Sequence, residues 1–340
     1  MDRRRFLRTA AGVATCGSLV SANHAITAAG ASAESDLTGP ADGTWSLVIL
    51  PDTQVYARLY PGLFHLQTQW ILENHKKDNI VYVLQNGDVT DNNVEIQWHR
   101  ASQAFARLDG NVPYAIALGN HDFGPNGSTQ DRTTLAHRHF PLSRFEKWPT
   151  FGGPMEPGKI DNTFHTFHAG GRDYLILCFE FGPRNEVLEW ANHVVERHPN
   201  HRTIVLTHAY LYSDSTRYDW QTRKDQQHWN PHNYPIAHSE TTINDGQEIW
   251  DKLVKRHRNM FMTINGHVLN DGLGFLTSPG NHGNPVHQML VNYQMLPVGG
   301  EAWLRILRFP PDAKTVEVED YSPLYDRFNT APDNRFTITL

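Results

Sequence analysis

The chain has 340 residues, a formal net charge of −6 and an aromatic content of 11%. This length suits one large domain or two small ones, and the composition is that of a globular protein able to bury a substantial core. The sequence contains no low-complexity tract, heptad run or fixed-period repeat. The negative charge argues against nucleic acid as a partner, because such binding depends on an excess of Lys and Arg.

The N-terminus has the pattern of a targeting peptide. Arg3-Arg4-Arg5-Phe6-Leu7 precedes a stretch rich in Ala, Gly and Val that ends near Ala31-Ser32-Ala33, a small-residue cleavage site. The Arg-Arg-x-Phe-Leu core resembles a twin-arginine export signal; a flexible basic tail is the alternative. We therefore expect residues 1–33 to be a signal peptide and the protein to be exported, to the periplasm or beyond.

Cleavage there would change the chain in two ways. Removing four Arg and one Asp takes away a net charge of +3, so the mature chain would carry −9. Cys178 would be left as a lone thiol in an apolar run, where we expect it to be buried and structural. The signal segment has too few strongly apolar residues to form a stable membrane span.

A linker and then one folded domain follow. Residues 34–44 are small and polar, with Gly39-Pro40 and Asp42-Gly43, which is typical of a linker. The domain is expected to cover residues 45–340. Within it, short apolar runs predict buried strands at residues 47–50, 80–84, 114–118, 203–206 and 260–262.

Helical spacing of apolar residues appears between these runs. It is seen at residues 63–70, 98–108, 187–195 and 249–254. Alternation of strands and helices favours a layered α/β fold with a largely parallel central sheet. Beyond residue 272, β-like runs at 286–293, 303–307, 315–318 and 336–340 are expected to finish a second sheet packed on the first.

Side chains able to bind metal follow five of the predicted strands directly. They are Asp52, Asp88, Asn120, His208 and His267. Each alone is an ordinary turn residue. Because α/β sheets bind ligands at the carboxyl ends of their strands, five such ends together indicate one shared site.

These residues, in this order, resemble the calcineurin-like metallophosphoesterase family over approximately residues 47–269. The resemblance implies a two-sheet αββα sandwich flanked by helices, with two divalent metal ions bound close together. Such a pair stabilises in-line displacement at phosphorus and activates water near neutral pH. The implied function is metal-dependent hydrolysis of a small phosphorylated substrate, either a phosphomonoester or a phosphodiester.

The resemblance also assigns metal ligands. It makes Asp88 the carboxylate that bridges both metals and places Asp52 on the first metal, where Gln54 could also bind through its carbonyl oxygen. The second metal would be bound by Asn120, His208 and His267. This mixed set of oxygen and nitrogen donors suits Mn, Zn or Fe better than Ca.

Two further residues receive catalytic roles from the resemblance. His121 would contact a phosphoryl oxygen or protonate the leaving group, and Asp91 would orient it. His is well suited to general acid catalysis because its ordinary pKa lies near neutral pH.

The sequence departs from the usual family pattern at the first metal. Asp52-x-Gln54 stands where Asp-x-His is usual, and Gly266-His267-Val268-Leu269 stands where Gly-His-x-His is usual. Leu269 cannot bind metal, and an amide is a weaker ligand than imidazole for transition metals. The first site should bind metal more weakly, prefer a harder ion, or recruit Asn270, Asp271 or water.

A long segment after His208 is rich in aromatic and His residues, and long loops at the mouth of a site often select the ligand. A surface excursion packed by its own aromatics is the alternative. Arg217 and Arg223 are candidates for phosphate contacts, and His282 and His287 for lining the pocket.

Two alternatives to a phosphoesterase remain. The departures at Gln54 and Leu269 suggest a degenerate relative that binds one metal, or a phosphorylated ligand, without turnover. A Zn hydrolase acting on amides or lactones would fit the ligand types but not the ordered motifs. His121 with Asp91 favours catalysis, because a binding module needs no proton donor.

Overall fold

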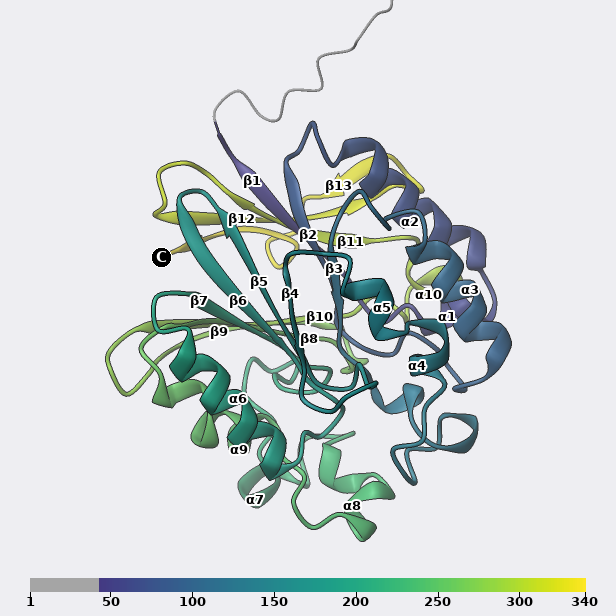
Figure 1. The fold of residues 1–340 in the computed structure, drawn as a ribbon, viewed down its shortest axis with the longest axis vertical. Coiled ribbons are helices and arrows are strands. Elements are labelled where there is room, and N and C mark those ends of the chain that lie inside the picture. The colour runs from purple at the N-terminus through teal and green to yellow at the C-terminus, as the bar shows by residue number, and fades with distance from the viewer. Residues whose placement is uncertain (1–42) are drawn as a thin grey trace, which may run out of the picture. The chain divides into compact units, whose positions relative to one another are not determined.

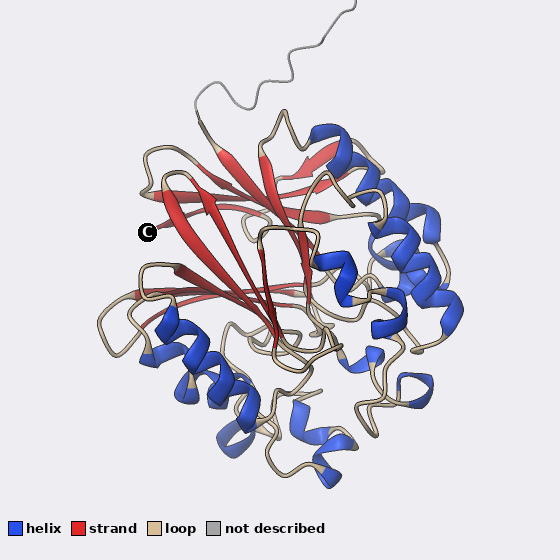
Figure 2. Ribbon diagram, viewed as in Figure 1, coloured by secondary structure: helices blue, strands red, loops and turns tan. Residues whose placement is uncertain are grey.

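The computed structural model describes residues 43–340, so the predicted signal peptide and most of the predicted linker lie outside the described residues. The described residues contain two seven-stranded mixed sheets (Figures 1 and 2). Sheet A has the order β13-β12-β11-β1-β2-β3, with β14 also paired to β12. Sheet B has the order β4-β5-β6-β7-β8-β10-β9.

The strand bounds are as follows. Sheet A contains β1 (Trp45–Leu50), β2 (Ile80–Gln85), β3 (Tyr114–Ile116), β11 (Leu304–Phe309), β12 (Thr315–Ser322), β13 (Arg327–Asn329) and β14 (Arg335–Thr339). Sheet B contains β4 (Phe151–Pro154), β5 (Thr163–Ala169), β6 (Arg172–Cys178), β7 (Arg202–Leu206), β8 (Met260–Asn265), β9 (Leu273–Pro279) and β10 (Pro285–Val291).

The predicted distribution of strands between the sheets was wrong, although a two-sheet sandwich is confirmed. Sheet A pairs β1 in parallel with β2 but antiparallel with β11, so C-terminal strands extend the N-terminal sheet. Sheet B joins β6, β7, β8 and β10 in parallel and adds antiparallel strands at both edges. Apolar runs predict that a strand is buried, but they do not select its neighbour.

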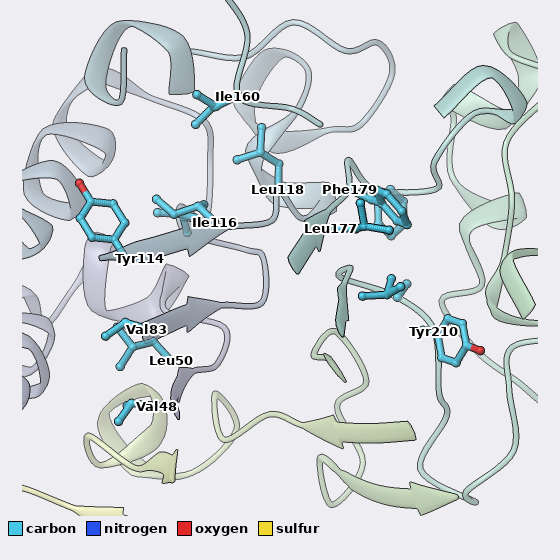
Figure 3. Packing of buried hydrophobic residues seen from close by; sticks show 14 of the residues in the cluster. Val48, Leu50, Val83, Tyr114, Ile116, Leu118, Ile160, Leu177, Phe179 and Tyr210 are labelled. Atoms are coloured by element: carbon cyan, nitrogen blue, oxygen red, sulfur yellow. The ribbon is translucent and has the colours of Figure 1, made fainter. Parts of the chain in front are cut away.

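Alternate residues of the strands enter different layers of the core. On β1, Leu47 and Ile49 belong to the cluster between the two sheets, whereas Val48 and Leu50 belong to the cluster on the helix side. This follows from the two-residue period of side chains along a strand. Figure 3 shows part of the helix-side cluster, including Val48 and Ile116. The lone thiol of Cys178 is buried between the sheets, as predicted.

Helices cover the outer face of each sheet (Figure 1). The α-helices are α1 (Gln54–Arg58), α2 (Pro61–Asn74), α3 (Glu95–Phe105), α4 (Ala136–His139), α5 (Leu142–Phe145), α6 (Asn185–Arg197), α7 (Trp220–Arg223), α8 (Ile236–Ser239), α9 (Gly246–Lys252) and α10 (Pro297–Gly300). Short 3₁₀ helices are η1 (Asn120–Asp122), η2 (Pro125–Gly127), η3 (Pro231–Asn233) and η4 (Val254–Arg256). Within residues 43–340, no helix combines the length and apolar character needed to cross a bilayer.

His165 on β5 makes the stability of the fold depend on pH. Its ring is buried, and Nδ1 lies 2.9 Å from the Tyr82 hydroxyl while Nε2 lies 3.1 Å from Thr163 Oγ1. Burial lowers the pKa of His165 to about 3. The unfolded chain binds a proton there below its ordinary pKa of 6.5, which the folded chain does not.

We predict that the free energy of unfolding falls as pH is lowered from about 6.5 towards about 3, with His165 contributing up to ~1.4 kcal/mol per pH unit in that window. His165→Gln keeps hydrogen-bonding capacity but cannot titrate, so its urea unfolding should show a shallower pH dependence. The exposed His99 on α3 is the control, since His99→Gln should leave the slope unchanged. An unchanged slope in His165→Gln contradicts the prediction.

Candidate metal centre

The carboxyl ends of strands from both sheets meet at one place. Asp52, Asp88 and Asn120 follow β1, β2 and β3 of sheet A, whereas His208 and His267 follow β7 and β8 of sheet B. A single, largely parallel central sheet carrying all five residues, which the alternation of strands and helices suggested, is therefore wrong as the scaffold. The site forms where the ends of two sheets converge.

Asn86 ties the two sheets together at this point. Its side-chain Oδ1 accepts a hydrogen bond from the backbone N–H of Asp52 at 3.2 Å, and its Nδ2 donates to the Val291 carbonyl at 3.0 Å. Its own carbonyl lies 2.9 Å from His208 Nδ1. Sequence reasoning missed Asn86, although its place directly before Gly87-Asp88 was a usable signal.

Several buried polar atoms in the cluster have no hydrogen-bond partner. They are Asp52 Oδ2, Asn120 Oδ1 and Gln54 Oε1, whereas His208 Nε2 has only the Asp88 carboxylate, 3.2 Å away. Ligand atoms of Asp52, Asp88 and His208 all lie within 4.8 Å of one another. Buried polar groups are normally satisfied, so this close cluster with unpaired oxygen atoms fits a bound cation.

Both imidazoles are held with one nitrogen directed at a backbone carbonyl. His208 Nδ1 donates to the Asn86 carbonyl, and His267 Nε2 donates to the Trp229 carbonyl at 2.8 Å. The opposite nitrogen of each ring carries the lone pair that a metal needs once the ring is neutral. Burial opposes protonation of His208, but Asp88 and Asp52 raise its pKa to about 9, so a metal would displace a proton from this ring. Burial and the neighbouring His208 lower the pKa of His267 to about 3, which keeps this ring neutral.

The carboxylates are crowded in a way that a cation would relieve. Burial, opposed by His208 and reinforced by Asp88, raises the pKa of Asp52 to about 8. Burial also disfavours the charged form of Asp88, but His208, whose Nε2 lies 3.2 Å from Asp88 Oδ1, and His121 hold the Asp88 pKa below its ordinary value. A divalent cation stabilises both carboxylates in their ionised form.

Three of these residues have left-handed backbone geometry. The φ angles are +40° at Asp52, +50° at Asp88 and +78° at His267. Such conformations cost about 1–3 kcal/mol each in residues other than Gly and gather at functional sites. Three of the predicted metal ligands therefore lie on strained backbone.

Two glycines allow the carboxylates to approach the backbone. A Cβ at Gly119 would lie 2.1 Å from Asp88 Oδ1, and one at Gly266 would lie 2.0 Å from Asp52 Oδ2. The loops after β2 and β3 are joined by Asp122, whose carboxylate accepts hydrogen bonds from the backbone of Gly119, Val89 and Thr90. Asp122 is a positioning residue to which sequence reasoning assigned no role.

His121 and Asp91 lie together, but not through the Asp91 carboxylate. The backbone N–H of His121 donates to Asp88 Oδ1 at 3.0 Å, and His121 Nδ1 lies 2.8 Å from the backbone carbonyl of Asp91. The Asp91 carboxylate instead pairs with Arg58 at 2.8 Å. Asp91 can orient the ring through its main chain, which a substitution of its side chain leaves in place.

Gln54 lies beside the bridging carboxylate. Its Nε2 donates to Asp88 Oδ2 at 2.9 Å and also contacts Gln294 Oε1. Asn270 and Asp271, the possible replacements for the ligand missing at Leu269, form other hydrogen bonds. Asn270 donates to Ser213 Oγ at 2.7 Å, and Asp271 accepts from the backbone N–H of Leu273 at 3.2 Å.

The long segment after β7 serves both the core and the site. Tyr210, Tyr212 and Tyr218 are buried in the core, in agreement with the structural alternative. Trp229, at a φ of +63°, fixes His267 through its carbonyl, and the Tyr234 ring lies 5.8 Å from the His267 ring. These two contacts connect the segment directly to a predicted ligand.

The Arg and His residues that were predicted to contact phosphate or to line the pocket either lie away from the site or are bound to other side chains. Arg217 is occupied by Gln288, Gln247 and Ser278 and stacks over the Trp250 ring at 3.9 Å. Arg223 faces Asp214. His282 precedes β10 and His287 lies near its start, at the opposite end of parallel strands β8 and β10 from His267. The prediction that both His residues line the pocket rested on their proximity to His267 in the sequence. It was wrong, because the length of a strand separates them from the site.

Gly119→Ala tests the close packing behind Asp88. The added methyl group must displace Asp88, so we predict a loss of metal affinity of about 10-fold or more, measured by calorimetric titration with Mn²⁺. Gly62→Ala on α2 is the control, because nothing lies within 4 Å of its Cβ and Ala favours a helix by up to about 1 kcal/mol. Wild-type affinity in Gly119→Ala would show that Asp88 does not bind the metal.

The chain is similar to several known proteins. YvnB of Bacillus subtilis (strain 168), an uncharacterized protein, is 30% identical over 319 residues, which cover 88% of this chain and 22% of YvnB. The purple acid phosphatase PPD1 from yellow lupin (Lupinus luteus) seeds has a similar fold, with a TM-score of 0.51 and 15% identity over 87% of this chain and 54% of PPD1. A 5'-nucleotidase precursor from Thermus thermophilus has a TM-score of 0.43 and 14% identity, covering 87% of this chain and 55% of that one.

The chain thus spans about a fifth of YvnB and about half of each of these two solved structures. A family model described as calcineurin-like phosphoesterase matches residues 46–239, more than half of the chain. With that match and the paired strand-end ligands, the chain belongs to the calcineurin-like phosphoesterase family.

Proposed function

We propose that this protein is a metal-dependent hydrolase of phosphate esters, monoesters or diesters, with a binuclear metal site. The observation that carries the proposal is the buried cluster of Asp52, Asp88 and His208, whose ligand atoms lie within 4.8 Å of one another, together with the buried, unpaired oxygen atoms of Asp52 and Asn120. Asp52, Gln54 and Asp88 would hold the first metal. Asp88, Asn120, His208 and His267 would hold the second.

The bound metals would supply Lewis-acid stabilisation of the phosphoryl group and an activated water. The protein's own residues position these ions and handle protons. His121 donates through Nδ1 to the Asp91 carbonyl, which leaves Nε2 to exchange a proton with the leaving group. Burial opposes protonation of His121, but Asp88 and the Asp91 carbonyl raise its pKa above the ordinary value, which favours the acid form.

A second reading, metal or phosphoester binding without turnover, rests on Gln54 and Leu269. Neither residue offers the imidazole that a transition metal prefers. The position of His121 favours catalysis, because its backbone is anchored to the bridging Asp88 and its ring is oriented.

The catalytic assignment is tested with aryl and alkyl phosphate mono- and diesters in the presence of Mn, Zn, Mg or Fe. Asp88→Asn should lose bound metal and activity together, because an amide cannot supply the bridging charge. His121→Ala should keep its metal but lose about 10²–10⁴-fold in kcat. Its loss should be larger for alkyl leaving groups, which need a proton, than for nitrophenolate, which does not.

His282→Ala is the matched control, since this exposed His lies at the far end of sheet B. Wild-type protein that binds metal but cleaves none of these esters would favour the binding alternative. Equal losses for all leaving groups in His121→Ala would remove the general acid role.

We also propose that residues 1–33 direct export, on the strength of the Arg3-Arg4 motif. Changing both residues to Lys should retain the full-length precursor inside the cell, as measured by fractionation and N-terminal sequencing. Arg8→Lys preserves the same charge outside the motif and should be exported normally. Normal export of the double variant would contradict the proposal.

A further inference from the structure

The first metal lacks a protein ligand at the position of Leu269, and the neighbouring residues do not replace it. Leu269 has no donor atom, and the Asn270 and Asp271 side chains are bound to Ser213 and to the backbone of Leu273. A site with only Asp52, Gln54 and the shared Asp88 would depend on water for the rest of its coordination. The structure offers another side chain instead.

Gln294, which follows β10, reaches the cluster from the opposite side. Its Oε1 contacts Gln54 Nε2, the same nitrogen that donates to Asp88 Oδ2. The oxygen atoms Asp88 Oδ2 and Gln294 Oε1 therefore flank the amide nitrogen of the buried Gln54 side chain. Gln54 Oε1 and Asp52 Oδ2, both buried, have no hydrogen-bond partner.

The backbone holds Gln294 in this position. Its N–H donates to Asn292 Oδ1 at 2.9 Å, and Asn292 Nδ2 donates to the Val268 carbonyl at 3.2 Å. The segment after β10 is thereby fastened to the loop that carries His267. Gln294 is half-buried, whereas the next residue, Met295, is exposed.

Rotating the Gln54 side-chain amide by half a turn brings its oxygen to the place that its nitrogen now occupies. The side chains at this point then present carboxylate oxygens from Asp52 and Asp88 and amide oxygens from Gln54 and Gln294. Hard cations such as Mn²⁺ and Mg²⁺ prefer oxygen donors, whereas Zn²⁺ binds more readily where imidazole or thiolate is present.

We infer that Gln294 is a ligand of the first metal and that this site, built only from oxygen donors, selects a hard divalent cation. The inference rests on the proposed binuclear function and adds a residue to it. The second site, with two imidazoles, would bind Zn²⁺ more readily than the first. The protein would thus hold two chemically different ions.

Metal binding to the full chain tests this without relying on activity. Metal-free protein is titrated with Mn²⁺ alone and with Zn²⁺ alone by calorimetry, and bound Mn²⁺ is followed by electron paramagnetic resonance. Wild type should bind Mn²⁺ at the first site, and Gln294→Leu should weaken that event about 10-fold or more while Zn²⁺ binding at the second site is unchanged. Gln294→Glu should tighten Mn²⁺ binding, because it adds a negative charge.

Two further variants sharpen the test. Gln54→His should shift the first site towards Zn²⁺, because imidazole replaces an amide oxygen. Asn270→Ala removes a nearby amide that binds Ser213 and should leave both titrations as in wild type.

Wild-type Mn²⁺ binding in both Gln294 variants, or loss of the first metal in Asn270→Ala, would overturn the inference and leave the proposed function standing. Wild-type protein that binds neither ion would overturn both.

Discussion

The junction made by Asn86 is the constraint on which the candidate metal centre depends. Through its side chain and carbonyl, this one residue holds the backbone of Asp52, the strand end at Val291 and the ring of His208. The ligands come from two sheets that share no strand pairing, so their spacing is set by contacts at the ends of strands. A second connection, from the His267 backbone to Asp52 Oδ1 at 3.0 Å, closes the same junction.

The site is costly for the fold, and the surrounding structure offsets that cost. Left-handed backbone at Asp52, Asp88 and His267, together with buried carboxylates, opposes folding in the absence of a cation. Apolar layers between the sheets and beneath the helices stabilise the strands that end there. Rigid strands with strained ends keep ligand atoms preorganised.

The proposed metal pair has an asymmetry that follows from the sources of its ligands. Sheet B contributes His208 and His267, each fixed by a backbone carbonyl, and these would bind the second metal. The first metal would rely on oxygen atoms from the turn after β1, from Asp88 and from Gln294. We therefore expect ions of different hardness at the two positions. The difference arises from Gln54 and Leu269, which stand where His is usual in the family.

Sequence by itself determined most of the strands, the main helices and the strand-end residues Asp52, Asp88, Asn120, His208 and His267, because side-chain period and turn position are local signals. It did not predict β4, β5, β6, β9 or β13. The resemblance carried by those residues supplied the two-sheet architecture. Tertiary structure alone decided which sheet each strand joins, that Asp91 meets His121 through its carbonyl, and that Asn86 and Gln294 face the site. Gln54 and Gln294 are 240 positions apart, and contacts between residues so distant leave no periodic trace in the chain.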